Sequence, residues 1–187
     1  MTTACPPLLA RTVRPLAGLF ALVLGGQLYR VGDSFAMTDT PDTPALRALA
    51  FSALRPGRLV ADRGTAAWIH GSRSRPPVQP QVCIDRRSRS RVPVGFDAHQ
   101  HVLDRGDTEV LSGVTVTAPL RTASDLVLTL SRFEPPDALE VRHLLALARA
   151  SPADLGERLR RSRRRGSARG LHRLAVVEQT RLPGPVT

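Results

Sequence analysis

Clustered and alternating apolar residues along the chain predict short strands and helices, and the segment Val110–Val127 shows this most clearly. Two short β-branched runs flank Ser112-Gly113, which is typical of a β-hairpin with a two-residue turn. A helix is predicted to follow at once, because Thr117 offers an N-cap oxygen and Pro119 lies in the first turn, where a missing N–H costs nothing. The pattern therefore places a hairpin-to-helix junction in the middle of the chain.

The start of the chain predicts a small unit made of one helix and one hairpin. Residues 14–25 are apolar with helical spacing, and residues 27–37 contain two short strands around the turn Gly32-Asp33. A helix followed by a hairpin is the second half of a winged helix-turn-helix, so we expect a partial winged helix at residues 1–37. The polar segment 38–44 follows as a linker.

The remaining pattern predicts an α+β fold class, in which a small mixed α/β domain with an antiparallel sheet precedes a C-terminal helical segment. We expect the mixed domain at residues 45–132, the C-terminal helices at 133–180 and a tail at 181–187. Ser151 and Asp154 have the spacing of a capping box. The expected strands lie at 82–84 and 92–102 besides the hairpin, and the expected helices at 45–55, 61–71, 118–132, 138–150, 152–165 and 171–179.

Composition indicates a folded protein with a basic surface. Of the 187 residues 42% are hydrophobic but only 4% are aromatic, so the core must be built from Leu, Val and Ala, and single-strand binding by base stacking is disfavoured. The formal net charge is +11, and all 27 basic residues are arginine. Such a charge favours an anionic partner, most often nucleic acid, although a GC-rich genome would also push surface cations toward arginine.

Two arginine clusters are candidates for contact with phosphates. Residues 158–169 carry the densest positive charge, on a predicted helix and the loop after it. That cluster equally fits a solvated helix face with cations near a helix C-terminus. Residues 86–91 lie in a predicted strand–strand turn, which is more typical of soluble surface than of a groove contact. The candidate DNA-contacting residues are Arg14, Arg30, Arg160, Arg161, Arg163, Arg164 and Arg165.

The sequence contains no pattern that predicts catalysis, a metal site or a cofactor. The two cysteines are far apart, and His99 and His101 alternate on a predicted strand without a converging third ligand. Nucleophile elbows, phosphate-binding glycine loops and zinc-protease motifs are missing. We therefore expect a non-enzymatic protein, in which Arg121 and Asp125 pair one helical turn apart. The residues expected to have structural roles are Trp68, His70, Pro119, Arg121 and Asp125.

An apolar run at residues 16–25 also fits a signal peptide, since Arg11 and Arg14 precede it and Ser34–Ala36 weakly resembles a cleavage site. A long polar gap separates the run from that site, and the run is too short to span a bilayer. A buried helix in a cytoplasmic protein without membrane contact is therefore the preferred interpretation. A secreted basic protein with a cleaved leader is the alternative.

Three stretches of the chain carry a resemblance to a known family. They are GQLYRVGDSFA at 26–36, VADRGTAAWIHG at 60–71 and GVTVTAPLRTASDLV at 113–127. In this order and spacing they resemble the AbiEi-like antitoxin family of type IV toxin–antitoxin systems, in its actinobacterial form. The third stretch is the most specific of the three, and the resemblance covers roughly residues 15–175.

The resemblance implies a cytoplasmic DNA-binding protein with an N-terminal winged helix. Such a protein would regulate transcription of its own operon by binding the operator DNA, and would oppose a nucleotidyltransferase-like toxin. Some relatives that share the middle region carry a C-terminal endonuclease domain like those of very-short-patch repair enzymes. Because only the second half of the winged helix can be matched here, and no nuclease segment, the alternative is a truncated, non-catalytic relative of those proteins.

Overall fold

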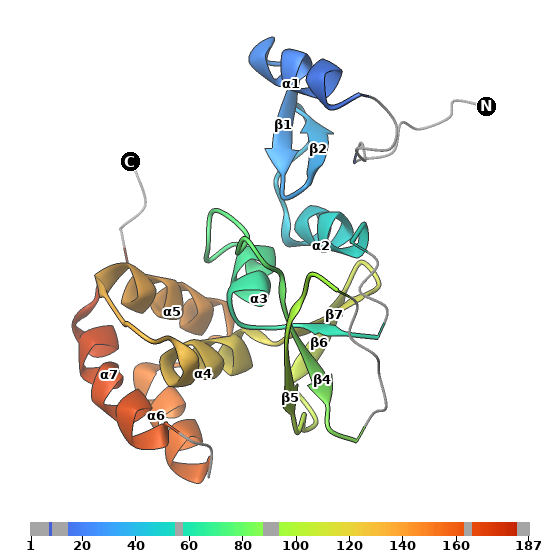
Figure 1. Cartoon of the computed structure of the whole chain (residues 1–187). Coiled ribbons are helices and arrows are strands. Elements are labelled where there is room, and N and C mark those ends of the chain that lie inside the picture. Colours follow the sequence, from blue (N-terminus) through green and yellow to red (C-terminus); the bar gives the residue numbers. More distant parts are fainter. Residues whose placement is uncertain (1–7, 9–14, 55–57, 88–93, 163–165, 183–187) are drawn as a thin grey trace.

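The computed structural model has an α+β fold, as the sequence predicts, with seven helices and two β-sheets among the residues that it describes (Figure 1). A helix-and-hairpin unit stands at one end, a mixed sheet lies in the middle, and a group of helices packs beside the sheet. None of the helices in the described part of the chain is long and apolar enough to cross a membrane. The described residues are 8, 15–54, 58–87, 94–162 and 166–182.

The N-terminal unit consists of α1 (Leu16–Leu24) and the antiparallel strands β1 (Leu28–Val31) and β2 (Ser34–Met37). A small apolar cluster holds it together, in which Leu19 of α1 packs with Phe35 of β2. The predicted order of helix and hairpin is confirmed. Its interpretation as part of a winged helix stays a prediction.

The second sheet has five strands in the order β5-β4-β3-β7-β6. It is mixed rather than antiparallel throughout, because two of its four pairings are parallel, β3 with β7 and β4 with β5. Apolar alternation identifies a strand but not the direction of its neighbour, and only the two-residue turn of the β6–β7 hairpin fixes an antiparallel pair locally. The strands are β3 (Val60–Ala61), β4 (Gln81–Asp85), β5 (Asp97–His101), β6 (Thr108–Leu111) and β7 (Val114–Thr117).

The junction between the β6–β7 hairpin and helix α4 (Pro119–Thr129) has the predicted turn. Ser112-Gly113 has positive φ at both residues, +48° and +79°, as a type I′ turn requires. The prediction that Thr117 caps α4 is wrong, since Thr117 is the last residue of β7 and the residue after it is the N-cap, without a side-chain bond. The Thr117 hydroxyl instead lies 2.8 Å from that of Thr122, because the strand turns it toward the second turn of α4.

The other helices lie close to the predicted positions. The capping box predicted at Ser151 and Asp154 is present at the start of α6. Helix α6 ends at Arg161 rather than near residue 165, and α7 begins at Ser167 rather than 171. The helices are α2 (Pro44–Ser52), α3 (Arg63–His70), α5 (Pro135–Leu147), α6 (Pro152–Arg161) and α7 (Ser167–Gln179).

Two apolar cores meet at α3. The first lies between α2, α3 and the five-stranded sheet and includes Phe51 and Ile69. The second lies among α4, α5, α6 and α7 and includes Leu126 and Leu144. Helix α3 contributes Ala66 to the first core and Ala67 to the second, so it is buried on both sides. Polar groups between the two cores must therefore find partners inside the protein.

Candidate nucleic-acid interface and the ion pairs behind it

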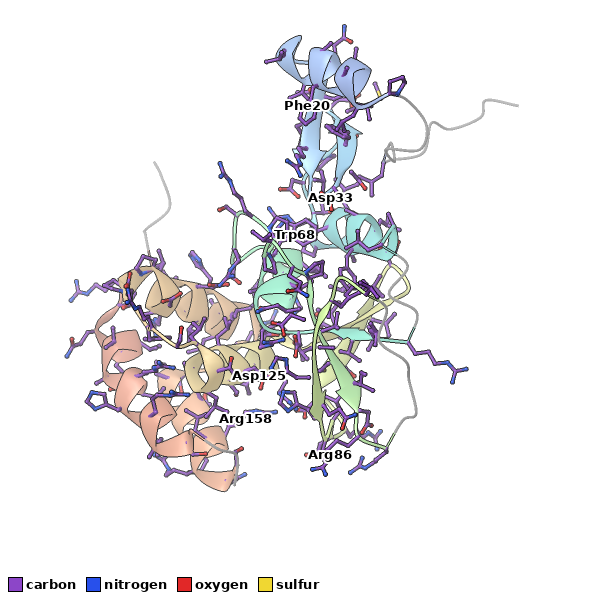
Figure 2. All side chains as sticks on the ribbon, viewed as in Figure 1. Phe20, Asp33, Trp68, Arg86, Asp125 and Arg158 are labelled. Atoms are coloured by element: carbon purple, nitrogen blue, oxygen red, sulfur yellow. The ribbon has the colours of Figure 1, made fainter. Side chains whose placement is uncertain are left out.

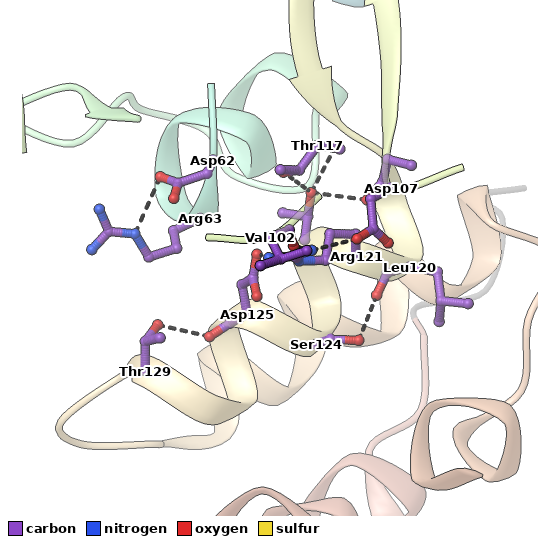
Figure 3. Close-up of polar contacts among 12 residues, drawn as sticks. Asp62, Arg63, Val102, Asp107, Thr117, Leu120, Arg121, Ser124, Asp125 and Thr129 are labelled. Carbon is purple, nitrogen blue, oxygen red and sulfur yellow. Dashed lines mark hydrogen bonds and ion pairs between the residues drawn. The ribbon is translucent and has the colours of Figure 1, made fainter. Parts of the chain in front are cut away.

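A buried set of ion pairs joins the sheet to helices α4 and α6. Asp107, only 3% exposed, accepts from Arg121 Nη1 at 2.5 Å and from Arg158 Nη2 through its other oxygen. Arg121 Nε also donates to Asp125 at 2.9 Å, which is the pair that the sequence predicts one helical turn apart (Figure 3). We call Asp107, Arg121, Asp125 and Arg158 the arginine–aspartate junction.

Opposite charges keep Arg121 and Asp107 ionised in spite of their burial. Burial alone lowers the pKa of Arg121, but the carboxylates of Asp125 and Asp107 outweigh it and raise that pKa. Burial also acts to raise the pKa of Asp107, yet the backbone N–H of Asp104 and the guanidinium of Arg158 lower it below its ordinary value. The contacts at Asp107 are therefore charge-assisted hydrogen bonds, the stronger kind.

A second buried carboxylate, Asp62, lies at the start of α3, beside the junction (Figure 3). Its Oδ1 accepts from Arg63 Nε at 3.2 Å, and its Oδ2 has no hydrogen-bond partner among the described residues. Burial raises the pKa of Asp62 to about 7, because Arg63 offsets only part of the desolvation and the Asp125 carboxylate adds repulsion. Arg63 also reaches Asp97 of β5, with its Nη1 3.1 Å from a carboxylate oxygen.

Two further residues of α3, both expected to be structural, connect the sheet to its surroundings. Trp68 is 4% exposed and lies under the hairpin turn, where a Cβ added to Gly32 would meet the indole at 3.2 Å. The Arg47 guanidinium lies 5.9 Å from the centroid of the indole. His70 Nε2 is 2.7 Å from the carbonyl oxygen of Thr117, which links α3 to β7. The N-terminal unit and the sheet therefore both rest on α3.

The arginines predicted to contact DNA do not form one patch. Arg30 lies in β1 and pairs with Asp33 at 3.1 Å, where the hairpin turn faces α2 and Trp68 (Figure 2). Arg160 and Arg161 lie on α6, in a separate region of the molecule, and both bind the exposed Glu157. The other candidates, Arg14, Arg163, Arg164 and Arg165, lie outside the described residues.

Two arginines of helix α7 bind backbone carbonyl groups at the end of α4. Arg173, 7% exposed, donates to the carbonyl oxygens of Val127 and Leu130 at 2.8 Å each. Arg169 Nη2 donates to the carbonyl oxygen of Leu128, also at 2.8 Å. The last carbonyls of a helix have no partner within it, and cations are favourable there. Helix α7 therefore caps the C-terminal end of α4.

Sequence reasoning missed the inward arginines and Asp107. It took the cluster at 158–169 as one surface, whereas Arg158 turns inward to Asp107 and only Arg160 and Arg161 stay exposed on α6. Helical spacing carries a signal for this, because position 158 follows the buried Leu155 by three residues and so lies on the same side of α6. Asp107 had no local signal, since its α6 partner is 51 residues away.

No three His, Cys, Asp or Glu side chains among the described residues are arranged to hold a metal ion. The rings of His99 and His101 stack with centroids 6.2 Å apart. The neighbouring carboxylate of Asp97 lies 3.5 Å from His99 and is also bound by Arg63.

Comparison with known proteins identifies the larger part of the chain. A family model described as the AbiEi antitoxin C-terminal domain matches residues 59–175, more than half of the sequence. A search of curated proteins finds no match. The matched span starts next to β3 and ends within α7, so it contains the whole arginine–aspartate junction.

Replacing Asp107 with alanine should strongly destabilise the fold. The change leaves the buried Arg121 with less compensation, and breaking a buried ion pair from one side typically costs about 3–5 kcal/mol. Glu157→Ala, which removes the exposed acid shared by Arg160 and Arg161, should change stability little. Urea unfolding followed by circular dichroism measures both. Equal losses in the two variants would contradict a special role of the junction.

The free energy of unfolding should fall as the pH rises from about 4 to about 7, because of Asp62. Its pKa in the folded state, about 7, lies above the ordinary value of 3.8, so the native state holds this proton more tightly than the unfolded chain does. The resulting stabilisation is fully present below the ordinary value and is lost as the pH rises through 7. Asp62→Asn should show a smaller decline between about pH 4 and pH 7.5 than the unchanged protein.

The exposed Asp33→Asn serves as the control for this pH profile, since it removes an acid without touching the interior. Its unfolding free energy should follow that of the unchanged protein across the range. If the Asp62→Asn profile also ran parallel to both, Asp62 would not be the group that titrates.

Proposed function

This chain belongs to the AbiEi antitoxin family, and from that premise we propose that it is the antitoxin and transcriptional regulator of a toxin–antitoxin operon. In this proposal it binds the operator DNA of that operon in the cytoplasm and opposes a nucleotidyltransferase-like toxin. The family match over residues 59–175 is the observation that carries the antitoxin role. The DNA role is supported by exposed arginines in two separate regions of the molecule.

Helix α6 supplies the first proposed DNA contact. The side chains of Arg160 and Arg161 are 57% and 79% exposed, and the single acid Glu157 is shared between them, so one positive charge is left over. Exposed arginines of this kind bind phosphates and release counterions, which gives affinity without base readout. The net charge of +11 adds long-range attraction to the same partner.

The N-terminal hairpin supplies the second proposed contact. Arg30 projects from β1, and its ion pair with Asp33 is exposed on both sides. An exposed pair of this kind contributes only about 0–1 kcal/mol, so exchanging Asp33 for a DNA phosphate costs little. In a winged helix the hairpin approaches the DNA beside the recognition helix, and α1 precedes the hairpin in that order here. Two contacts in separate regions suit an extended ligand such as a duplex.

We also propose that the protein acts by binding and not by catalysis. The buried charges that resemble active-site groups, Asp107 and Arg121, are bound to one another and to neighbouring side chains. Asp62 has a raised pKa but is fully buried beside Arg63, at 0% exposure, where a substrate does not reach it. These buried charges are thus explained by a structural role, in which they join the sheet to the helices.

Full-length protein should bind a duplex taken from upstream of its own gene in a gel-shift assay. The affinity should fall steeply with salt, and the double variant Arg160→Ala, Arg161→Ala should reduce the slope of log K against log salt by up to about 2. The control variant Arg58→Ala, Arg132→Ala removes the same charge from two exposed positions elsewhere. No binding at low salt would remove the DNA role, and equal slopes for the two double variants would remove α6 from it.

Coexpression of the full chain with the toxin encoded beside it should restore growth that the toxin alone arrests. Asp107→Ala should weaken this rescue in proportion to its loss of folded protein, because the junction lies inside the matched antitoxin domain. Colony counts with and without the antitoxin measure the effect. A protein that is folded and abundant in these cells but gives no rescue would contradict the antitoxin role.

A further inference from the structure

A groove opens between the sheet and helix α6, next to the arginine–aspartate junction. Its volume is about 950 Å³, and it is lined by the ends of β4 and β5, the turn before β6, and the facing sides of α4 and α6. Pockets of roughly 300–1,000 Å³ are the usual size for small-molecule ligands. Of the two α6 arginines proposed to contact DNA, only Arg161 reaches its lining. The groove therefore borders the exposed face of α6 and shares Glu157 and Arg161 with it.

Two arginines of the lining are available for an anion. Arg86 follows β4 and Arg105 lies in the turn between β5 and β6; both are exposed, and neither has an acidic partner among the described residues. Figure 2 shows Arg86 at the same end of the molecule as Arg158 of α6, which also lines the groove. Guanidinium groups bind phosphate oxygens in pairs of parallel hydrogen bonds, and arginines from separate elements can hold one phosphate from two directions.

The acidic residues of the lining offset the positive charge of Arg86 and Arg105 only in part. Asp107 and Glu157 are already bound by arginines, and Asp154 completes the capping box of α6. Asp104 is the one acid of the lining without a charged partner in the described part of the chain. An anion in the groove is therefore attracted by Arg86 and Arg105 and repelled mainly by Asp104.

The wall of the groove is partly apolar. Leu120 of α4 and Val102 after β5 give it accessible apolar surface, whereas Leu128 and Leu159 lie behind them and are almost fully buried. A bare phosphate ion leaves this wall in contact with water, whereas a ligand with an apolar or heterocyclic body next to its phosphate covers it. Cationic and apolar lining together thus favour a ligand that has both parts.

We propose that this groove binds a small organic phosphate of the nucleotide class, with the phosphate between Arg86 and Arg105 and the body against Leu120 and Val102. A DNA duplex is not the occupant, because it presents its phosphates on a wide convex surface and cannot lay a ring against the inner wall. This site does not depend on the proposed antitoxin and DNA-binding roles. It would give the protein a small-molecule ligand next to the junction that joins its sheet to its helices.

Isothermal titration calorimetry on the full chain tests the proposal with three sets of probes. These are the four nucleoside 5′-monophosphates, the matched nucleosides without phosphate, and inorganic phosphate. At least one monophosphate should bind one-to-one, with a Kd on the order of 10–100 µM from ordinary ligand efficiency. The matched nucleoside and inorganic phosphate should each bind at least about tenfold more weakly, since each uses only one part of the groove.

Variants with opposite expected effects on the Kd distinguish loss of ligand recognition from loss of folded protein. Arg86→Ala and Arg105→Ala should each weaken binding of the monophosphate by about tenfold, through loss of charge-assisted hydrogen bonds. Asp104→Asn should tighten it, because the repulsion is removed and the shape is kept. The matched control is Arg87→Ala, since Arg87 is the exposed neighbour of Arg86 and is not part of the lining. It should leave the Kd unchanged.

Three results would overturn the proposal. The first is no saturable binding of any of the four monophosphates by folded protein at about 5 mM, far above the expected Kd. The second is an equal loss in Arg86→Ala and Arg87→Ala, which would indicate a general charge effect. The third is that Arg86→Ala and Arg105→Ala weaken only the gel shift with duplex DNA, which would assign these arginines to the DNA surface.

Discussion

The carboxylate of Asp107 is the contact on which the arrangement of sheet and helices depends. It stands just before β6 and binds one guanidinium from α4 and another from α6, so three elements meet at two oxygen atoms. A carboxylate in this place compensates the charge of Arg121, whose burial would otherwise be costly, and also binds the half-buried Arg158. Because Arg121 is also bound by Asp125 on its own helix, α4 presents its guanidinium in one orientation. The position of the helical layer against the sheet follows from that geometry.

Burial of arginine changes what the net charge of +11 means. Arg73 binds Glu140 through two nitrogens at 2.9 and 2.8 Å, Arg173 caps α4, and Arg47 donates to two backbone carbonyls near α3. These cations hold elements together and are not offered to a partner. The formal charge is therefore larger than the positive charge that is exposed to nucleic acid. Among the described residues, exposed arginines available to such a partner lie in separate regions, such as the outer side of α6 and the hairpin around Arg30.

Local signals in the sequence predicted most elements, because turns and caps act within a few residues. The turn Ser112-Gly113 and the capping box at Ser151 are of this kind, and both are present. The direction of strand pairing and the partners of Asp107 depend on residues far away along the chain, and a single sequence does not show them. The candidate site was predictable in part for the same reason: the pair Arg121–Asp125 lies within one helix, whereas Arg158 enters from another.

The absence of lysine from the chain has a structural side as well as a compositional one. Arg121 donates from Nε to Asp125 and from Nη1 to Asp107, in two directions fixed by a planar fork. A lysine carries a single ammonium at the end of a flexible stem and cannot hold both acids in that geometry. On the exposed face of α6 the requirement is only positive charge near phosphate, which lysine also meets. Arginine is therefore required at the buried position 121, whereas the exposed positions on α6 would also accept lysine. The two kinds of position thus differ in whether they tolerate a change from arginine to lysine.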